Sequence, residues 1–235
     1  MPSGTGKLHS QQLAHRVQLR SLSWQLDGRA LLCGTADGKL LSLSLDGSTD
    51  AQQLASLAAE EAGDGAELTL IRPLDDRRVL LGYHNPQTLV EQDPSYFAVF
   101  DRQHGAIQQC GSSCFPLGRE EDGEPPPRSF HCVHVPEWRM AVVCSTDSDE
   151  VCSYGSRKPG EAQRWQRWEL PDEEGPPGVP TFEVGDVFED QFIMGLALDL
   201  SNEERLVLIA GHHLNLMQPC VLVSLSFQSF YTLLC

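Results

Sequence analysis

The stretch LRSLSWQLDGRALLCGTADGKLLSLSLDG, residues 19–47, decides the fold class. Leu22, Trp24 and Leu26 alternate with polar neighbours, which is the period of a half-buried strand. Asp-Gly pairs at 27–28 and 37–38 then separate this strand from two further short apolar runs. Because Asp-Gly between such runs is a strong hairpin signal, the stretch predicts a β-meander.

The same strand pattern recurs three times downstream. Comparable first strands begin near residues 20, 68, 130 and 193. Four-strand repeats at such spacing are typical of propeller blades. The sequence therefore predicts an all-β, WD-type β-propeller. We expect a flexible N-terminus over 1–16, blades over approximately 17–57, 66–112, 128–170 and 190–225 within a propeller that spans 17–225, and an irregular C-terminal tail over 226–235.

A few segments depart from the strand pattern. No convincing long helix is present, and the Ala- and Glu-containing stretch 51–62 is the best candidate for a short surface helix. Residues 117–128 contain three consecutive prolines, which excludes the interior of a sheet. Residues 171–191 hold seven acidic residues and no basic one, and we expect a loop there. Long loops of this kind are where partner contacts concentrate.

The charge balance excludes several classes of partner. The 235 residues include 17 Lys+Arg and 33 Asp+Glu, for a net charge of −16. Nucleic acids and anionic membranes are recognised by clustered basic residues, so no direct nucleic-acid or membrane binding is expected. A protein partner with a basic patch fits the sign of the charge. Residues 1–19 lack the apolar core of a secretion signal, so the eight cysteines are expected to be reduced, in a nuclear or cytosolic protein.

Candidate chemical motifs are incomplete. The SGTGK stretch at 3–7 lacks the first glycine and the Ser or Thr of a phosphate-binding loop. Cys110, Cys114, His131 and His134 could donate to zinc, but the two histidines are three apart on an expected strand and so face opposite ways. The carboxylates occur in runs, and no nucleophile elbow is present. We predict no catalytic residue, no metal ligand, no cofactor, no small-molecule substrate, and hence no enzyme.

Trp165 and Trp168 lie three residues apart in RWQRWELP. On a strand the two side chains point to opposite faces. We expect one to belong to the core. The other is expected to cover an edge or a loop, where it could alternatively contact a peptide.

Three later segments carry a family resemblance: VHVPEWRMAVVCSTDSDEVCSYGS (133–156), RWQRWELPDEEG (164–175) and FIMGLALDLSN (192–202). In this order they resemble the N-terminal propeller of the cytoplasmic-face nucleoporin family with phenylalanine-glycine repeats. The family propeller has seven blades, and the chain resembles roughly the last four, so we expect a partial propeller. The resemblance implies docking of the DEAD-box RNA helicase of mRNA export at the cytoplasmic face of the nuclear pore complex, with other nucleoporins as further partners.

The resemblance also implies where the helicase docks. In the family, charged loops on one side of the propeller make the contact. Carried over by position, the candidate residues are Glu91, Asp93, Asp172, Glu173, Glu174, Glu183 and Asp186. The family has a basic residue in the linker that holds the last five, and this chain has none. The alternative function is that of a generic WD-repeat scaffold for an unrelated protein complex.

Overall fold

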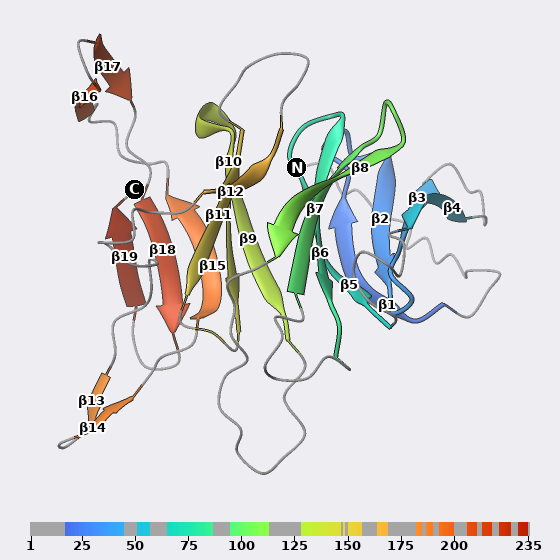
Figure 1. Ribbon diagram of the computed structural model, residues 1–235, viewed down its shortest axis with the longest axis horizontal. Helices are drawn as coiled ribbons and strands as arrows, with labels where there is room; N and C mark the ends of the chain where they lie inside the picture. Colours follow the sequence, from blue (N-terminus) through green and yellow to red (C-terminus); the bar gives the residue numbers. More distant parts are fainter. Residues whose placement is uncertain are drawn as a thin grey trace, which may run out of the picture.

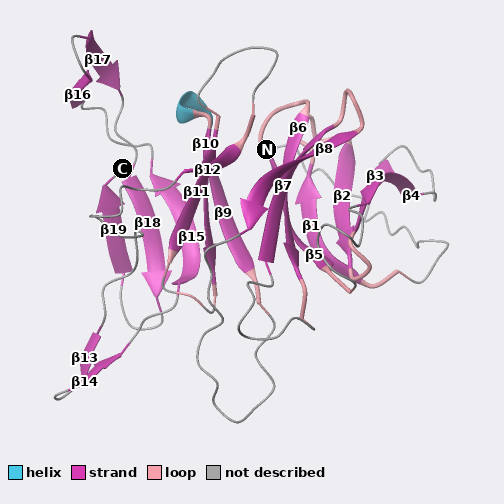
Figure 2. Ribbon diagram, viewed as in Figure 1, coloured by secondary structure: helices cyan, strands magenta, loops and turns pink. Residues whose placement is uncertain are grey.

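The computed structural model describes residues 17–44, 51–56, 65–86, 95–112, 128–146, 148, 150–156, 164–168, 182–184, 187–189, 193–199, 206–210, 213–217, 221–226 and 230–234. Only the backbone is described for 111–112, 182–184, 187–189 and from Asp199 onward. Strands dominate this part of the chain (Figure 1, Figure 2). None of its helical residues form a segment long and apolar enough to cross a bilayer.

Blade 1 is a four-stranded antiparallel sheet whose strands follow one another in sequence order. Its strands are β1 (Leu19–Trp24), β2 (Ala30–Thr35), β3 (Lys39–Ser44) and β4 (Ala51–Ser56). Gly28 and Gly38 have φ angles of 67° and 72°. Both angles lie in the left-handed region that glycine adopts without strain, so each Asp-Gly pair makes the tight turn that the sequence predicts.

Blades 2 and 3 repeat this arrangement. Blade 2 contains β5 (Glu67–Pro73), β6 (Arg78–His84), β7 (Ser95–Asp101) and β8 (Ala106–Ser112). Blade 3 contains β9 (Phe130–Val135), β10 (Met140–Ser145), β11 (Val151–Gly155) and β12 (Gln166–Trp168), with the short 3-10 turn η1 (Pro136–Trp138) between its first two strands. All three sheets are antiparallel and sequential.

The fourth unit is less regular. Its sheet has the order β15 (Ile193–Asp199), β18 (Val221–Ser226), β19 (Phe230–Leu234). Two separate hairpins accompany it, β13 (Phe182–Val184) with β14 (Val187–Glu189), and β16 (Leu206–Ala210) with β17 (His213–Met217). Three four-stranded sheets and this three-stranded sheet confirm the prediction of an all-β, partial β-propeller.

Three local expectations are wrong. Residues 51–56 form β4 rather than the start of a helix, because β3 supplies their hydrogen-bonding partners and Ala55 is buried in the core. A short helix without tertiary support is marginal in water, so these residues form a strand of the sheet instead. The 171–191 segment contains the β13–β14 hairpin rather than only a loop. The tail over 226–235 is not irregular, since β19 pairs with β18 along its length.

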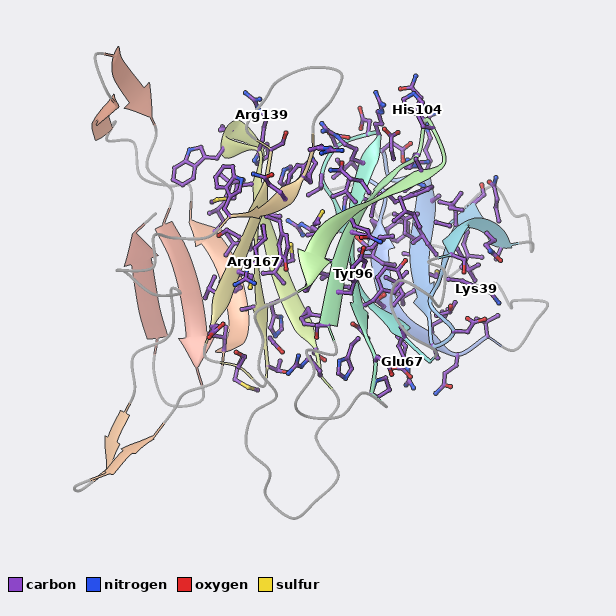
Figure 3. All side chains as sticks on the ribbon, in the orientation of Figure 1. Lys39, Glu67, Tyr96, His104, Arg139 and Arg167 are labelled. Carbon is purple, nitrogen blue, oxygen red and sulfur yellow. The ribbon has the colours of Figure 1, made fainter. Side chains whose placement is uncertain are left out.

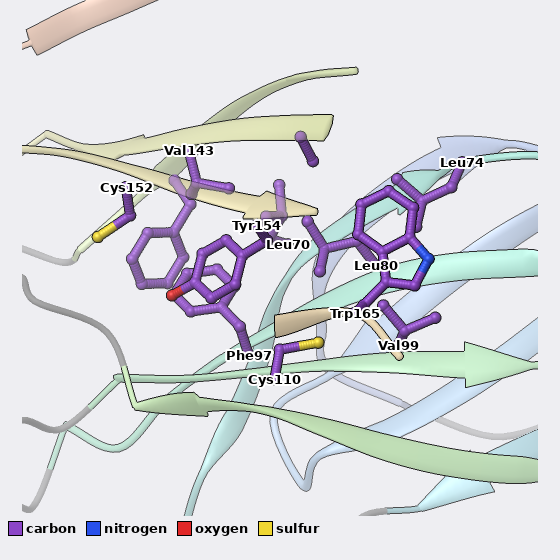
Figure 4. Close-up of a cluster of buried hydrophobic side chains, with 12 residues drawn as sticks. Leu70, Leu74, Leu80, Phe97, Val99, Cys110, Val143, Cys152, Tyr154 and Trp165 are labelled. Atoms are coloured by element: carbon purple, nitrogen blue, oxygen red, sulfur yellow. The ribbon is translucent and has the colours of Figure 1, made fainter. Parts of the chain in front are cut away.

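Apolar side chains from facing sheets form three successive cores. Leu32 and Leu40 of blade 1 pack with Leu68 and Leu81 of blade 2. Phe97 of blade 2 meets Phe130 and Tyr154 of blade 3 at ring-centroid distances of 5.1 and 5.0 Å (Figure 4). The third core joins blade 3 to β15. Its buried residues are Val133, Val135, Met140, Val142, Cys144, Val151 and Ile193. The sheets therefore stack face to face in sequence order, like neighbouring propeller blades.

One apolar row does not enter these cores. The alternation of Leu22, Trp24 and Leu26 predicts a half-buried strand, yet these side chains are 58%, 57% and 61% exposed. Their polar neighbours Ser21 and Ser23 face blade 2 instead, and Ser21 Oγ donates a 2.8 Å hydrogen bond to the Leu68 carbonyl. Periodicity predicted the strand correctly but did not show which of its faces is covered within this chain.

Candidate protein-binding surface

Most of the acidic residues predicted to bind a partner lie outside the described residues. Glu91 and Asp93 belong to the connection between β6 and β7, and the acidic run at 172–174 follows β12. Asp186 falls between β13 and β14. Glu183 lies on β13, where its backbone pairs with Phe188, but its side chain is not described. The structure therefore brings none of these side chains together, and the predicted site stays a prediction.

The charge of the chain is distributed very unevenly between the strands and the rest. The described residues include 11 Lys+Arg and 11 Asp+Glu, so they are electrically balanced. The remaining residues include 6 Lys+Arg and 22 Asp+Glu, and they carry the whole net charge of −16. Sequence reasoning located one acidic linker, but the acidic surplus is shared among several segments outside the described residues.

The described anchors of the predicted acidic segments lie along one edge of the molecule. β6 ends at His84 and β7 begins at Ser95, and these two residues pair across the strands, as His84 does with Glu67. Figure 3 places Glu67 at the lower edge, and Figure 1 places the β13–β14 hairpin on the same lower side. The connections that hold Glu91, Asp93 and Glu183 are thus anchored on a common side.

A buried arginine strengthens this edge between blades 2 and 3. Arg128 precedes β9 and is only 3% exposed, and its Nη1 donates a 2.8 Å hydrogen bond to Ser95 Oγ. Other buried polar residues lie at neighbouring strand ends, namely His84, Asn85, Ser145 and Ser148. A guanidinium is very costly to bury unless it is hydrogen-bonded. Sequence reasoning missed Arg128, because a single arginine after a Pro-rich segment carries no local signal of burial.

The opposite edge holds an ordered ion-pair network in the hairpin turns of blade 2. Arg77 reaches Asp101 through two nitrogens, with Nε–Oδ1 at 2.9 Å and Nη2–Oδ2 at 2.6 Å. His104 Nδ1 lies 3.2 Å from Asp101 Oδ2, and Figure 3 shows His104 at the upper edge with Arg139. The hydrogen bond from Arg77 holds the pKa of the Asp101 carboxyl well below its ordinary value, despite some burial.

A second ion pair lies at the same edge. Arg78 donates from Nη2 to Asp75 Oδ2 at 2.6 Å, and the backbone N–H of Arg77 donates to Asp75 Oδ1 at 2.9 Å. Burial acts to raise the pKa of Asp75, but these hydrogen bonds outweigh it, so the pKa lies below its ordinary value. Both carboxylates are occupied by arginines of their own blade. They fix the turns rather than present free charge.

The predicted zinc donors are not assembled into a site. Among the described residues, no group of three or more His, Cys, Asp or Glu could hold a metal ion, and Cys114 lies outside them. Cys110 is buried, and burial raises the pKa of its thiol to about 12. His131 and His134 alternate along β9, and the ring of His134 lies 6.2 Å from that of Trp165, on the blade 2 side. The opposite orientation of the two histidines agrees with the strand period.

The thiols differ from the sequence prediction at one position. Cys33, Cys110, Cys132 and Cys144 are free. Cys152 on β11 is disulfide-bonded, so the prediction of reduced thiols throughout the chain is wrong there. Cys152 also contributes to the core between blades 2 and 3.

The two tryptophans of RWQRWELP follow the prediction of opposite faces. Trp165 is 2% exposed in the core between blades 2 and 3. Trp168 packs against the next core, between blade 3 and β15. Trp165 is thus a core residue, and Trp168 is half-buried.

No protein-family model matches the chain, and no curated protein matches it either. Two solved structures are similar to the chain. The first, from Bacteroides uniformis and provisionally named a 6-phosphogluconolactonase, has 10% identity and a TM-score of 0.46 over 91% of this chain and 69% of its own. The second, the Nup133 β-propeller domain of Vanderwaltozyma polyspora, has 12% identity and a TM-score of 0.43 over 76% of this chain and 50% of its own.

These likenesses concern the fold. The chain spans about half the length of the Nup133 domain chain. The prediction that the chain is not an enzyme is contradicted, since a chain of similar path carries the name of an enzyme. Propeller folds host unrelated activities, so the absence of familiar motifs was an insufficient reason to exclude catalysis.

Proposed function

We propose that this chain is a nucleoporin-type docking module, which binds the DEAD-box RNA helicase of mRNA export at the cytoplasmic face of the nuclear pore complex. The residues proposed to contact a basic patch on the helicase are Glu91, Asp93, Asp172, Glu173, Glu174, Glu183 and Asp186. The motifs at 133–156, 164–175 and 192–202, which resemble the nucleoporin propeller, motivate the choice of partner.

The separation of charge from strands is the observation that carries this proposal. The described residues are electrically balanced, while the residues outside the described set hold 22 acids and 6 bases. A surface of one sign attracts a partner of the opposite sign and raises the association rate. The acidic connections are thus suited to capture a basic protein surface, and poorly suited to bind nucleic acid directly.

Docking would act through local concentration. A helicase held beside emerging ribonucleoprotein meets its substrate at an effective concentration well above that in bulk solution. The ion pairs of Arg77 with Asp101 and of Arg78 with Asp75 join residues of the blade 2 turns.

The proposal is tested by calorimetry of the 235-residue chain with the purified helicase at 50 and 300 mM NaCl. Reversing Asp172, Glu173 and Glu174 to lysine should weaken binding by at least about 10-fold at the lower salt, because close charge pairs contribute on the order of 1.5 kcal/mol or more. The matched control reverses three exposed acids that lie between described strands, Asp27, Asp76 and Glu137, and should change the affinity far less.

Two results would contradict the proposal. Absence of binding to the helicase at 50 mM NaCl would exclude this partner and leave the generic WD-repeat scaffold as the better account. Equal losses for the two triple variants would show that net charge alone, rather than the acidic linker, governs the contact. Circular dichroism of each variant confirms that the sheets remain folded.

A further inference from the structure

Arg128 joins two neighbouring blades at the lower edge of the molecule. Its side chain is only 3% exposed, and its Nη1 donates a 2.8 Å hydrogen bond to Ser95 Oγ, at the start of β7 in blade 2. The next residue, Ser129, is held by blade 3. Its carbonyl accepts from the Thr146 N–H at 3.0 Å, just after β10, and its N–H donates to Thr146 Oγ1 at 3.2 Å. Arg128 thus spans the contact between the two blades.

Ser95 is the residue at which an acidic connection returns to the sheet. It pairs with His84 across β6 and β7, so the connection over 85–94 leaves and re-enters blade 2 at one paired position. This connection contains Glu91 and Asp93 and no basic residue. Ser95 is buried, and consecutive Cα atoms are only 3.8 Å apart. Fixing Ser95 therefore limits where Asp93, two residues earlier in the chain, can lie.

Packing alone does not call for an arginine between the two blades. Burial of a guanidinium costs free energy, and apolar residues of similar size often serve a folded core equally well. Arginine differs from them in having a rigid, planar group whose hydrogen bonds fix direction as well as distance. Its presence here indicates that the position of the start of β7 relative to blade 3 matters.

We infer that Arg128 is a positioning residue for docking, because its hydrogen bond to Ser95 fixes where the connection with Glu91 and Asp93 re-enters the sheet. The inference rests on the proposed function, in which these two carboxylates contact a basic patch on the helicase. Attraction at long range depends on the number of charges, whereas close contact depends on their positions. Loss of the hydrogen bond at constant net charge should therefore shorten the lifetime of the complex and leave its rate of formation unchanged.

Two substitutions disrupt this hydrogen bond and keep the net charge of −16. Arg128→Lys keeps the cation but replaces the planar guanidinium, and Ser95→Ala removes the acceptor oxygen. In surface plasmon resonance of the 235-residue chain with the purified helicase at 50 mM NaCl, each should raise the dissociation rate at least about 5-fold, with less than about a 2-fold change in association. Ser129→Ala, at the exposed serine beside Arg128, is the matched control and should leave both rates unchanged.

The double variant tests whether the two side chains act through one bond. After either substitution the other has no hydrogen bond left to remove, so Arg128→Lys with Ser95→Ala should raise the dissociation rate no further than the larger single effect. Two effects that multiply would show that the side chains act independently and would overturn the inference. A variant that is merely less stable lowers the amount of complex formed without changing the rate constants, and urea unfolding of each variant measures that contribution.

Hydrogen exchange of the free chain separates this inference from the proposed function. Arg128→Lys and Ser95→Ala should each speed the exchange of amides at the start of β7 and leave β2 of blade 1 unchanged. Unchanged exchange at β7, or an unchanged dissociation rate from the helicase, would contradict the positioning role. Absence of helicase binding to the wild type, with exchange at β7 accelerated in the variants, would refute the proposed function and the docking role while confirming that Arg128 anchors β7.

Discussion

His134 shows how burial of one side chain couples the fold to pH. It lies partly buried on β9 with its ring 6.2 Å from the ring of Trp165. Burial lowers its pKa from the ordinary 6.5 to about 4, and the positive charge of Arg72 acts in the same direction. The folded chain therefore keeps this imidazole neutral at a pH at which the unfolded chain protonates it.

The sign of the pH effect follows from this difference. Between pH 6.5 and 4 the unfolded state binds more protons at His134, so stability is lost as the pH falls through this range. The urea midpoint should decline from pH 7.5 to 4.5 for the wild type and decline less for His134→Asn. The slope of the unfolding free energy against pH should differ between the two proteins by the equivalent of up to about one bound proton per molecule. Parallel curves for the wild type and His134→Asn would show that His134 is not held neutral in the fold.

At the scale of single elements, β11 and β12 are held together by a very close contact. A Cβ atom added at Gly155 would lie 2.6 Å from Trp168 Cζ2 and 3.1 Å from the Arg139 carbonyl oxygen. The absence of a side chain lets the tryptophan ring lie close to β11 and pack against the core shared with β15. This glycine serves packing rather than a turn.

Gly155→Ala should therefore destabilise the chain by about 1–3 kcal/mol, measured by urea unfolding, because the core is overpacked. In a Trp168→Leu background, where the clashing ring is gone, the same change should cost at least about 0.5 kcal/mol less. Ser153→Ala in the same strand is the control for altered strand composition. Strictly additive effects of the two substitutions would show that the alanine does not meet Trp168.

The elements that could be read from the sequence are those whose signals are local. Asp-Gly turns fixed the hairpins of blade 1, and alternation located β5 to β11 closely. The β13–β14 hairpin was missed because the abundance of acids and prolines around it outweighed a short alternation over 182–189. The assignment of 51–56 to a helix failed because strand pairing with β3 is a tertiary effect, which a propensity argument does not contain.

At the scale of the whole molecule, the described residues are electrically balanced and the net negative charge lies in the rest of the chain. The net charge could be counted from the sequence. That the described residues carry none of it could not be predicted, because such a count requires the boundaries of the strands. Likewise, alternation in β1 cannot tell whether Leu22 and Trp24 face a neighbouring sheet or solvent. Burial of Arg128 also depends on the meeting of blades 2 and 3, which are distant in sequence from one another at this edge.

The central claim is that the acidic segments steer the chain onto a basic helicase surface, and the association rate tests it most directly. Stopped-flow mixing of the chain with the helicase from 20 to 300 mM NaCl should give an association rate that falls at least about 10-fold with increasing salt. Reversal of Asp172, Glu173 and Glu174 should reduce the low-salt rate and flatten the dependence, with little change in dissociation. A rate that is independent of salt, or one that the reversal leaves unchanged, would contradict the account.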